Sequence, residues 1–145
     1  MHTLQIAAEQ KGQTLTADIA PGITLDGDSG KLMQIFYNLT DNAIKYTPEN
    51  GHIAVRLAQS GANVLFAVTD DGIGIPEEDQ KHIFERFYRV DKARSRATGG
   101  TGLGLSIVRQ LAAMHGGTVS VSSQPGQGAT FTVTLPMDAK RGEKA

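Results

Sequence analysis

Hydrophobic and polar residues alternate one by one in several short stretches of the chain. Such alternation is typical of strands that have one face in the core and the other in water. It predicts strands at residues 13–19, 52–59, 118–122 and 129–135, and the more fully apolar run at 64–69 predicts another. The Gly-containing segments at 60–63 and 124–128 predict the turns of two hairpins. A short apolar run at 23–25 is a candidate for one more strand.

A second pattern, with apolar residues three and four positions apart, predicts helices. It predicts a long helix from 28 or 29 to about 46, a second from 103 to 115, and a short acidic helix at 77–84. Because hairpins separate these helices, the chain lacks strict strand-helix alternation. We therefore expect an α/β (α+β) fold: a two-layer sandwich in which a mixed, mostly antiparallel sheet of about five strands is covered on one face by about three helices.

Composition narrows the classes of function. The 145 residues are 39% hydrophobic and fit one domain, and the formal net charge of -1 argues against a nucleic-acid partner. The sequence has no cysteine, and its four histidines are scattered, which excludes thiolate metal sites and argues against a zinc cluster. The lack of cysteine fits a reducing, cytosolic setting. No apolar run approaches the ~20 residues of a membrane span, so we expect no direct membrane contact.

The first long helix carries a polar stripe beside its apolar face. Asn38, Asn42 and Lys45 fall within about 60° of one another at helical spacing. Amide oxygens suit a hard cation such as Mg²⁺, and a lysine suits phosphate oxygens. The alternative is an ordinary amphipathic helix with surface amides.

Two glycine-bearing segments add candidate chemistry. Asp70 follows an apolar strand and precedes Gly72 and Gly74, so an acceptor-only carboxylate is placed where the chain can approach a flat ring. The alternative is a plain Asp-Gly turn. The segment 100–104 opens a helix with unobstructed backbone N–H groups, which attract polyanions, although it is equally typical of a flexible loop. Residues 27–32 look like a P-loop but lack its first glycine and its Ser or Thr.

The order of these segments is more specific than any one of them. The chain contains, in sequence, NLTDNAIKYTP (38–48), DDGIGIP (70–76), FERFYRV (84–90), GGTGLGLSIV (99–108) and GQGATFTVTLP (126–136). Between residues 14 and 135 it resembles the N, G1, F and G2 boxes and the closing hairpin of the catalytic ATP-binding domain (HATPase_c, GHKL or Bergerat fold) of bacterial two-component sensor histidine kinases. The sequence from residue 84 onward is similar to that of the PhoR/WalK branch.

This resemblance implies ATP and Mg²⁺ as cofactors and assigns roles residue by residue. Asn38 and Asn42 would hold Mg²⁺, and Tyr46 and Asp70 would contact adenine. Asn38, Lys45 and Arg89 form the implied catalytic group, and residues 90–101 the lid. The full implied cofactor-binding set is Asn38, Asn42, Lys45, Tyr46, Asp70, Gly72, Gly74, Ile75, Arg89, Val90, Gly100, Thr101, Gly102, Leu103, Gly104, Leu105 and Thr130.

The resemblance also implies what this chain works with. No histidine here has the sequence context of a phosphoacceptor, so we expect the acceptor in an upstream helical dimerisation domain, a response regulator as a further partner, and a parent protein anchored in the bacterial cell membrane. Residues 1–12 would be a remnant of the linker, 13–136 the ATP-binding catalytic domain, and 137–145 a disordered polar tail.

Two alternatives remain at this point. One is a hydrolytic ATPase of the same fold, which uses a glutamate at the position of Asn38 to activate water. The other is a nucleotide-sensing module without catalysis, which would predict damage at the Mg²⁺ and phosphate positions.

Overall fold

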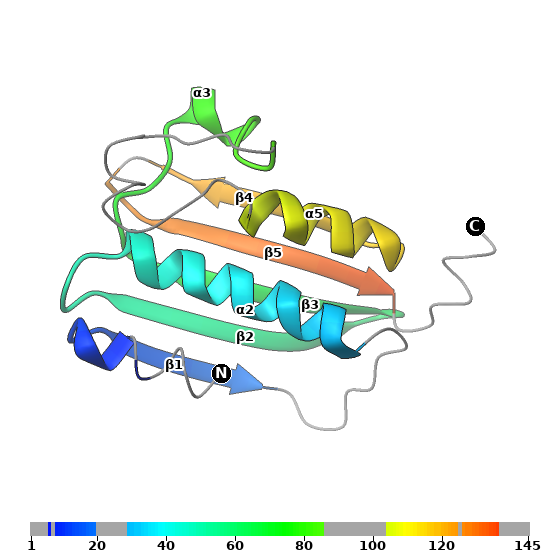
Figure 1. The fold of residues 1–145 in the computed structure, drawn as a ribbon, viewed down its shortest axis with the longest axis horizontal. Coiled ribbons are helices and arrows are strands. Elements are labelled where there is room, and N and C mark those ends of the chain that lie inside the picture. The colour runs from blue at the N-terminus through cyan, green and yellow to red at the C-terminus, as the bar shows by residue number, and fades with distance from the viewer. Residues whose placement is uncertain (1–5, 7, 20–28, 86–103, 125, 137–145) are drawn as a thin grey trace.

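The fold is described from a computed structural model of the chain (Figure 1). The structure describes all residues except 1–5, 7, 20–28, 86–103, 125 and 137–145. Its elements are β1 (Thr14–Ile19), α2 (Ser29–Tyr46), β2 (His52–Ser60), β3 (Asn63–Asp70), α3 (Glu77–Gln80), α5 (Gly104–Met114), β4 (Thr118–Ser123) and β5 (Ala129–Pro136). The candidate strand at 23–25, the predicted lid and the predicted tail lie outside the described residues.

The five strands form one sheet in the order β1-β2-β3-β5-β4. β1 and β2 are parallel, and every other neighbouring pair is antiparallel. A parallel pair needs a long connection, and α2 lies within the one between β1 and β2. Helices α2 and α5 run side by side over the same face of the sheet (Figure 1). The predicted mixed, mostly antiparallel sheet with helices on one face is therefore confirmed.

The core lies between this sheet face and the two long helices. Alternate residues of β3 and β5 are buried against α2 and α5, as the period-2 pattern predicts. The side chains that are almost fully buried include Ile35, Leu39, Ile53, Val64, Val68, Val108, Phe131, Val133 and Leu135. Each such burial is worth about 1.5–3 kcal/mol relative to exposure. The ring centroids of Phe36 on α2 and Phe66 on β3 lie 4.4 Å apart, which joins the two layers.

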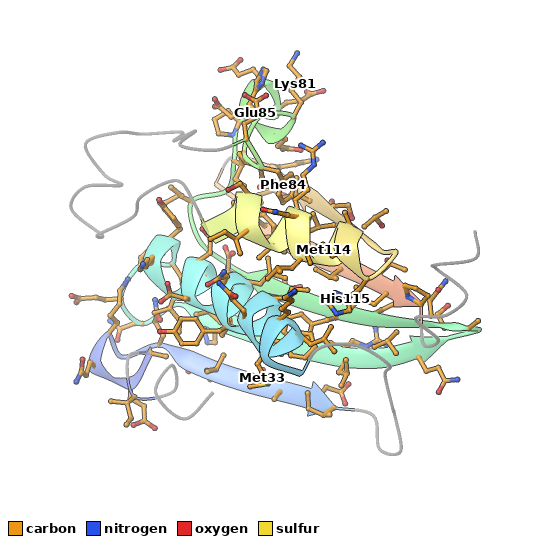
Figure 2. All side chains as sticks on the ribbon, turned by 45° about the vertical axis from the view of Figure 1, so that its right-hand side comes forward. Met33, Lys81, Phe84, Glu85, Met114 and His115 are labelled. Carbon is orange, nitrogen blue, oxygen red and sulfur yellow. The ribbon has the colours of Figure 1, made fainter. Side chains whose placement is uncertain are left out.

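The short acidic helix ends earlier than its sequence predicts. Helix α3 covers only Glu77–Gln80, and the following residues form turns. Ile83 is buried in the core, and the ring of Phe84 meets Phe131 edge to face at 6.2 Å between centroids. Figure 2 shows Lys81 and Glu85 at the outer tip of this segment and Phe84 nearer the sheet. Packing of the two hydrophobic side chains thus takes precedence over continuing the helix.

The segment before β1 packs onto the domain. Residues 8–10 are helical, and Ala8 belongs to the hydrophobic core. Gln13 is also buried, with 6% of its surface exposed. The boundary that the sequence predicts after residue 12 therefore runs through a packed segment. Among the described residues, none of the helices combines the length and hydrophobicity needed to cross a bilayer.

Candidate functional site

The candidate site lies at the end of the sheet where β3 ends and β5 begins. Helix α2 ends there, whereas α5 begins farther along the sheet (Figure 1). Because α2 and α5 run in opposite directions, the first turn of α5 is directed toward the end of the sheet where α2 ends. The fold thereby brings together polar groups that are far apart in the sequence.

Helix α2 presents the predicted polar stripe at the boundary between core and solvent. Asn38, Asn42 and Lys45 are half-buried. Lys45 Nζ lies 3.0 Å from Asp41 Oδ2, one helical turn earlier, and both side chains are partly exposed. Such an ion pair contributes only about 0.3–0.5 kcal/mol to stability, so Lys45 can exchange Asp41 for a bound anion at a small cost in free energy. Lys45 was predicted from the sequence and Asp41 was not, although the i,i+4 spacing is visible there.

Asn38 and Asn42 are the candidate ligands for Mg²⁺. The described residues contain no group of three His, Cys, Asp or Glu side chains that could hold a metal. Two amide oxygens one turn apart are hard but neutral donors. Mg²⁺ is commonly bound through one or two side chains, with phosphate oxygens and water completing its octahedron. The residues therefore fit Mg²⁺ carried by a nucleotide.

Asp70 is the buried charge of the site. It ends β3 with 8% of its surface exposed and faces Ala129 across the β3–β5 pair. Burial raises the pKa of its carboxyl group above the usual value, while backbone N–H groups of Gly72 and Ala129 oppose that rise. The Gly72 N–H donates to Asp70 Oδ1 at 2.9 Å. A carboxylate fixed in this way is suited to accept a hydrogen bond from a ligand.

Gly72 lets the end of α2 approach the end of β3. A Cβ atom there would lie 2.6 Å from the Tyr46 carbonyl oxygen and 2.9 Å from Asp70 Oδ1. No real side chain tolerates such contacts with a backbone atom, so any larger residue would push the two ends apart. Gly74 has a φ of +73°, which favours glycine for a different reason. The sequence predicted glycines that make room for a base, and the structure adds that Gly72 makes room for the protein itself.

The turn after β3 is held by a network that the sequence analysis missed. Ser123 Oγ accepts from the Ile75 N–H at 2.8 Å and donates to the Gly128 carbonyl at 2.6 Å. Gln80 Nε2 donates to the carbonyl oxygens of Ile75 at 2.9 Å and of Ser123 at 2.8 Å. The Gly126 N–H donates to the Ile73 carbonyl at 2.8 Å. These bonds fix Ile75, one of the predicted site residues, onto the β4–β5 hairpin.

A second missed contact fixes the start of the same turn. Asp71 accepts hydrogen bonds from the backbone N–H of His52 at Oδ1 (2.7 Å) and from its ring Nδ1 at Oδ2 (2.9 Å). The backbone and side-chain bonds of His52 lower the pKa of Asp71. The turn after β3 is thus tied to the first residue of β2, next to Asp70.

The structure does not bring Thr130 to the site. On β5, Ala129 and Phe131 are buried toward the helices, so the intervening Thr130 points to the opposite face. There its Oγ1 lies 3.1 Å from Thr69 Oγ1. The predicted role of Thr130 in cofactor binding is therefore corrected, and Ala129 is the β5 residue that lies on the Asp70 face. The alternation along β5 was a sequence signal that could have avoided this error.

The glycine-rich segment is only partly described. Gly104 begins the 11-residue helix α5, and a Cβ atom built on it would have nothing within 4 Å, so the space beside Gly104 itself is open. Leu105 is half-buried against the core. Six other predicted site residues lie outside the described residues: Arg89, Val90, Gly100, Thr101, Gly102 and Leu103.

Both the sequence and the fold resemble those of known proteins. The sequence profile of the family described as histidine kinase-, DNA gyrase B-, and HSP90-like ATPase matches residues 27–139. The sensor-like histidine kinase SenX3 of Mycolicibacterium smegmatis is 48% identical over 132 residues, which cover 91% of this chain and 34% of that protein. The sensor histidine kinase WalK of Bacillus subtilis is 45% identical over 111 residues, or 75% of this chain and 18% of that protein. The chain thus spans about a third of the length of the first curated relatives it matches.

Two solved structures extend the comparison to the fold. The mycobacterial sensor histidine kinase MprB superimposes with a TM-score of 0.80 and 33% identity, covering 93% of this chain and 91% of that one. A full-length structure of ShkA in complex with AMPPNP gives a TM-score of 0.79 and 36% identity, covering 93% of this chain and 28% of that one.

Proposed function

The chain belongs to the family of histidine kinase-, DNA gyrase B- and HSP90-like ATPases, and on that premise we propose that it is the ATP-binding catalytic domain of a two-component sensor histidine kinase. It binds Mg-ATP and transfers the γ-phosphoryl group to a histidine on a separate domain. The observation that carries this proposal is the buried Asp70 carboxylate, held against the last turn of α2 through Gly72.

Asp70 gives the site its preference for a base. The carboxylate accepts a hydrogen bond from the exocyclic amine of adenine, whereas guanine presents an oxygen at the same position. Tyr46 and the turn containing Gly72, Gly74 and Ile75 flank the ring. The AMPPNP bound to ShkA, a solved relative, supports a nucleotide of this class.

The polar stripe of α2 serves the phosphates. Asn38 and Asn42 would hold Mg²⁺, which when bound neutralises charge on the phosphoryl group being transferred. Lys45 leaves Asp41 and pairs with phosphate oxygens. The N-terminus of α5, beginning at Gly104, offers backbone N–H groups to the same polyanion. Arg89, Val90 and residues 100–103 complete the phosphate side.

Asn38 favours phosphoryl transfer over hydrolysis. A neutral amide cannot act as the base that activates water, so the bound nucleotide is hydrolysed slowly. Transfer then depends on an acceptor placed in line with the γ-phosphate. We propose that the acceptor histidine belongs to an upstream helical dimerisation domain, that a response regulator receives the phosphoryl group, and that other segments of the parent protein anchor it in the membrane.

The first experiment tests base recognition by isothermal titration of the chain with ATP and GTP in the presence of Mg²⁺. ATP should bind and GTP should bind much more weakly. Asp70→Asn keeps the size of the side chain, and Gly72 can still donate to the amide oxygen. The amide then turns a donor toward adenine, and affinity should fall roughly ten- to a hundredfold. Asp18→Asn, on the exposed edge strand β1, is the matched control and should leave affinity unchanged.

A second experiment tests transfer. The chain is incubated with radiolabelled ATP, with and without the parent's helical dimerisation domain as a separate polypeptide. Label should appear on the added domain only, and it should be lost in acid and retained in base. Equal affinity for ATP and GTP would contradict the base assignment, and label on this chain alone would contradict the division of labour between domains.

A further inference from the structure

The last turn of α2 lacks one of its own hydrogen bonds. In a continuing helix, the Ile44 carbonyl would accept from the backbone N–H four residues later. That residue is Pro48, which has no N–H. The carbonyl is at the buried end of the helix that carries Asn42, Lys45 and Tyr46. It therefore needs a donor from elsewhere in the chain.

Two side chains from the segment before β1 supply that donor. Lys11 Nζ lies 2.8 Å from the Ile44 carbonyl oxygen and 3.0 Å from that of Thr47. Gln13 Nε2 lies 2.7 Å from the Thr47 oxygen and 3.1 Å from the Ile44 oxygen. Gln13 is buried, and its orientation is determined by its partners, because only the NH₂ group can donate to carbonyls. The lysine charge also lies at the negative end of the helix dipole.

Backbone contacts lock the same two segments together. The Asn50 N–H donates to the Lys11 carbonyl at 3.1 Å, and the Thr14 N–H donates to the Gly51 carbonyl at 2.9 Å. Gly12 has a φ of +68°, and a Cβ atom there would lie 2.6 Å from Asn50 Oδ1. The end of α2 therefore lies between the segment before β1 and the turn after β3, where Gly72 meets the Tyr46 carbonyl.

We propose that Lys11 and Gln13 are positioning residues of the nucleotide site. They hold the last turn of α2 in the position in which Asn42, Lys45 and Tyr46 contact the nucleotide. Through Lys11 and Gln13, the segment before β1 therefore controls nucleotide affinity. This inference rests on the proposed function, because it assumes that the nucleotide binds at that turn. The coupling between these hydrogen bonds and nucleotide binding is reciprocal. If the bonds of Lys11 and Gln13 raise nucleotide affinity by some factor, bound nucleotide must stabilise those bonds by the same factor.

The test compares variants by calorimetric titration with Mg-ATP. Gln13→Glu replaces the donor by a charged acceptor facing carbonyl oxygens, and affinity should fall about fivefold or more. Lys11→Met should have a smaller effect of the same sign, because Gln13 still donates to the same carbonyls. Lys11→Arg keeps a cationic donor and should remain within about twofold of the unaltered chain. The matched control is Gln59→Glu, because Gln59 lies at the far end of β2 and donates to the exposed Gly61 carbonyl.

A second measurement separates positioning from simple stabilisation. In the unaltered chain, hydrogen exchange of the Gln13 side-chain amide should slow about fivefold or more when ADP is added, as reciprocity requires, while that of Gln59 should not change. This measurement and Lys11→Met decide the question if Gln13→Glu does not fold.

The outcomes distinguish the two proposals. If the unaltered chain binds no ATP, the proposed function is overturned and the positioning role with it. If it binds ATP, but Lys11→Met has unchanged ATP affinity and the exchange rate of the Gln13 amide does not change when nucleotide is added, only the positioning role is overturned. Weakened binding together with slowed exchange at Gln13 supports it.

Discussion

The turn between β2 and β3 and the turn after β3 lie at opposite ends of the same strand, and both contain glycine. Gly61 in the first has a φ of +60°, and a Cβ atom there would meet nothing within 4 Å. Gly72 in the second would place a Cβ atom 2.6 Å from the Tyr46 carbonyl oxygen. Gly61 is therefore required by its own backbone conformation, whereas Gly72 is required by its neighbours.

The difference lies in what each turn is packed against. The turn at 60–63 only reverses the chain. The turn after β3 is held by α2, by Gln80 of α3 and by the β4–β5 hairpin, and it fixes Asp70 in place. We therefore expect a substitution at the second turn to change both the stability of the fold and the proposed nucleotide binding.

The largest effect is expected from Gly72→Ala. The added methyl group meets backbone atoms that cannot rotate away, which should lower the free energy of unfolding by about 1–3 kcal/mol. It should also weaken ATP binding, because Tyr46 and Asp70 are pushed apart. Gly61→Asn is the control: asparagine tolerates positive φ, so the loss should be under about 0.5 kcal/mol, with ATP affinity unchanged. Denaturant unfolding and ATP titration measure both quantities, and equal losses in the two variants would remove the contrast.

Ser123→Ala should have the next largest effect. It leaves the Ile75 N–H without its partner, at a cost of about 1 kcal/mol in unfolding free energy. The freed turn should also bind nucleotide more weakly. Ser122→Ala, one residue earlier on the exposed face of β4, should change neither quantity. Similar behaviour of the two serine variants would show that the network does not hold the turn.

Acid should loosen the second turn through Asp71. Its pKa is lowered in the folded state by the bonds from His52. The resulting stabilisation is present above the unfolded pKa of about 3.9 and is lost as pH falls through the lower folded value. Asp71→Asn should therefore reduce the acid dependence of unfolding, by a small amount because the carboxylate is half exposed. His52→Ala should remove only part of it, since the backbone N–H of residue 52 still donates. An unchanged acid dependence in Asp71→Asn would contradict this role.

The smallest effect is expected at Thr130. Thr130→Val keeps the shape of a side chain that points away from Asp70, so ATP affinity should stay within about twofold of the unaltered chain. Ala129→Val, one residue earlier on the Asp70 face, should weaken ATP binding because Ala129 is buried beside that carboxylate. A large loss of ATP affinity in Thr130→Val would restore the residue to the site.

The predicted residues that the structure brings together are those whose positions follow from the local periodicity of a helix or a strand. Asn38, Asn42 and Lys45 share a helix edge because a helix repeats every 3.6 residues. Asp70 and Gly72 follow from an apolar strand that ends in a tight turn. The resemblance to sensor histidine kinases rested on the same motifs, and the family match and the similarity to SenX3 and MprB confirm it. Apart from Asp41, the residues that were missed have distant partners: the bond from Ile75 to Ser123 spans 48 positions, that from Lys11 to Ile44 spans 33, and that from His52 to Asp71 spans 19.

The sequence by itself determined the elements, their order and the chemical type of the site, because periodicity and turn residues act over a few positions. Tertiary structure alone decided which donors complete the end of α2 and why Gly72 has no side chain. Each of these depends on the distance between atoms of segments brought together by the sheet order β1-β2-β3-β5-β4. The local sequence pattern carries no information about such distances, because it does not specify which distant atoms will lie next to a given backbone N–H group or Cβ atom.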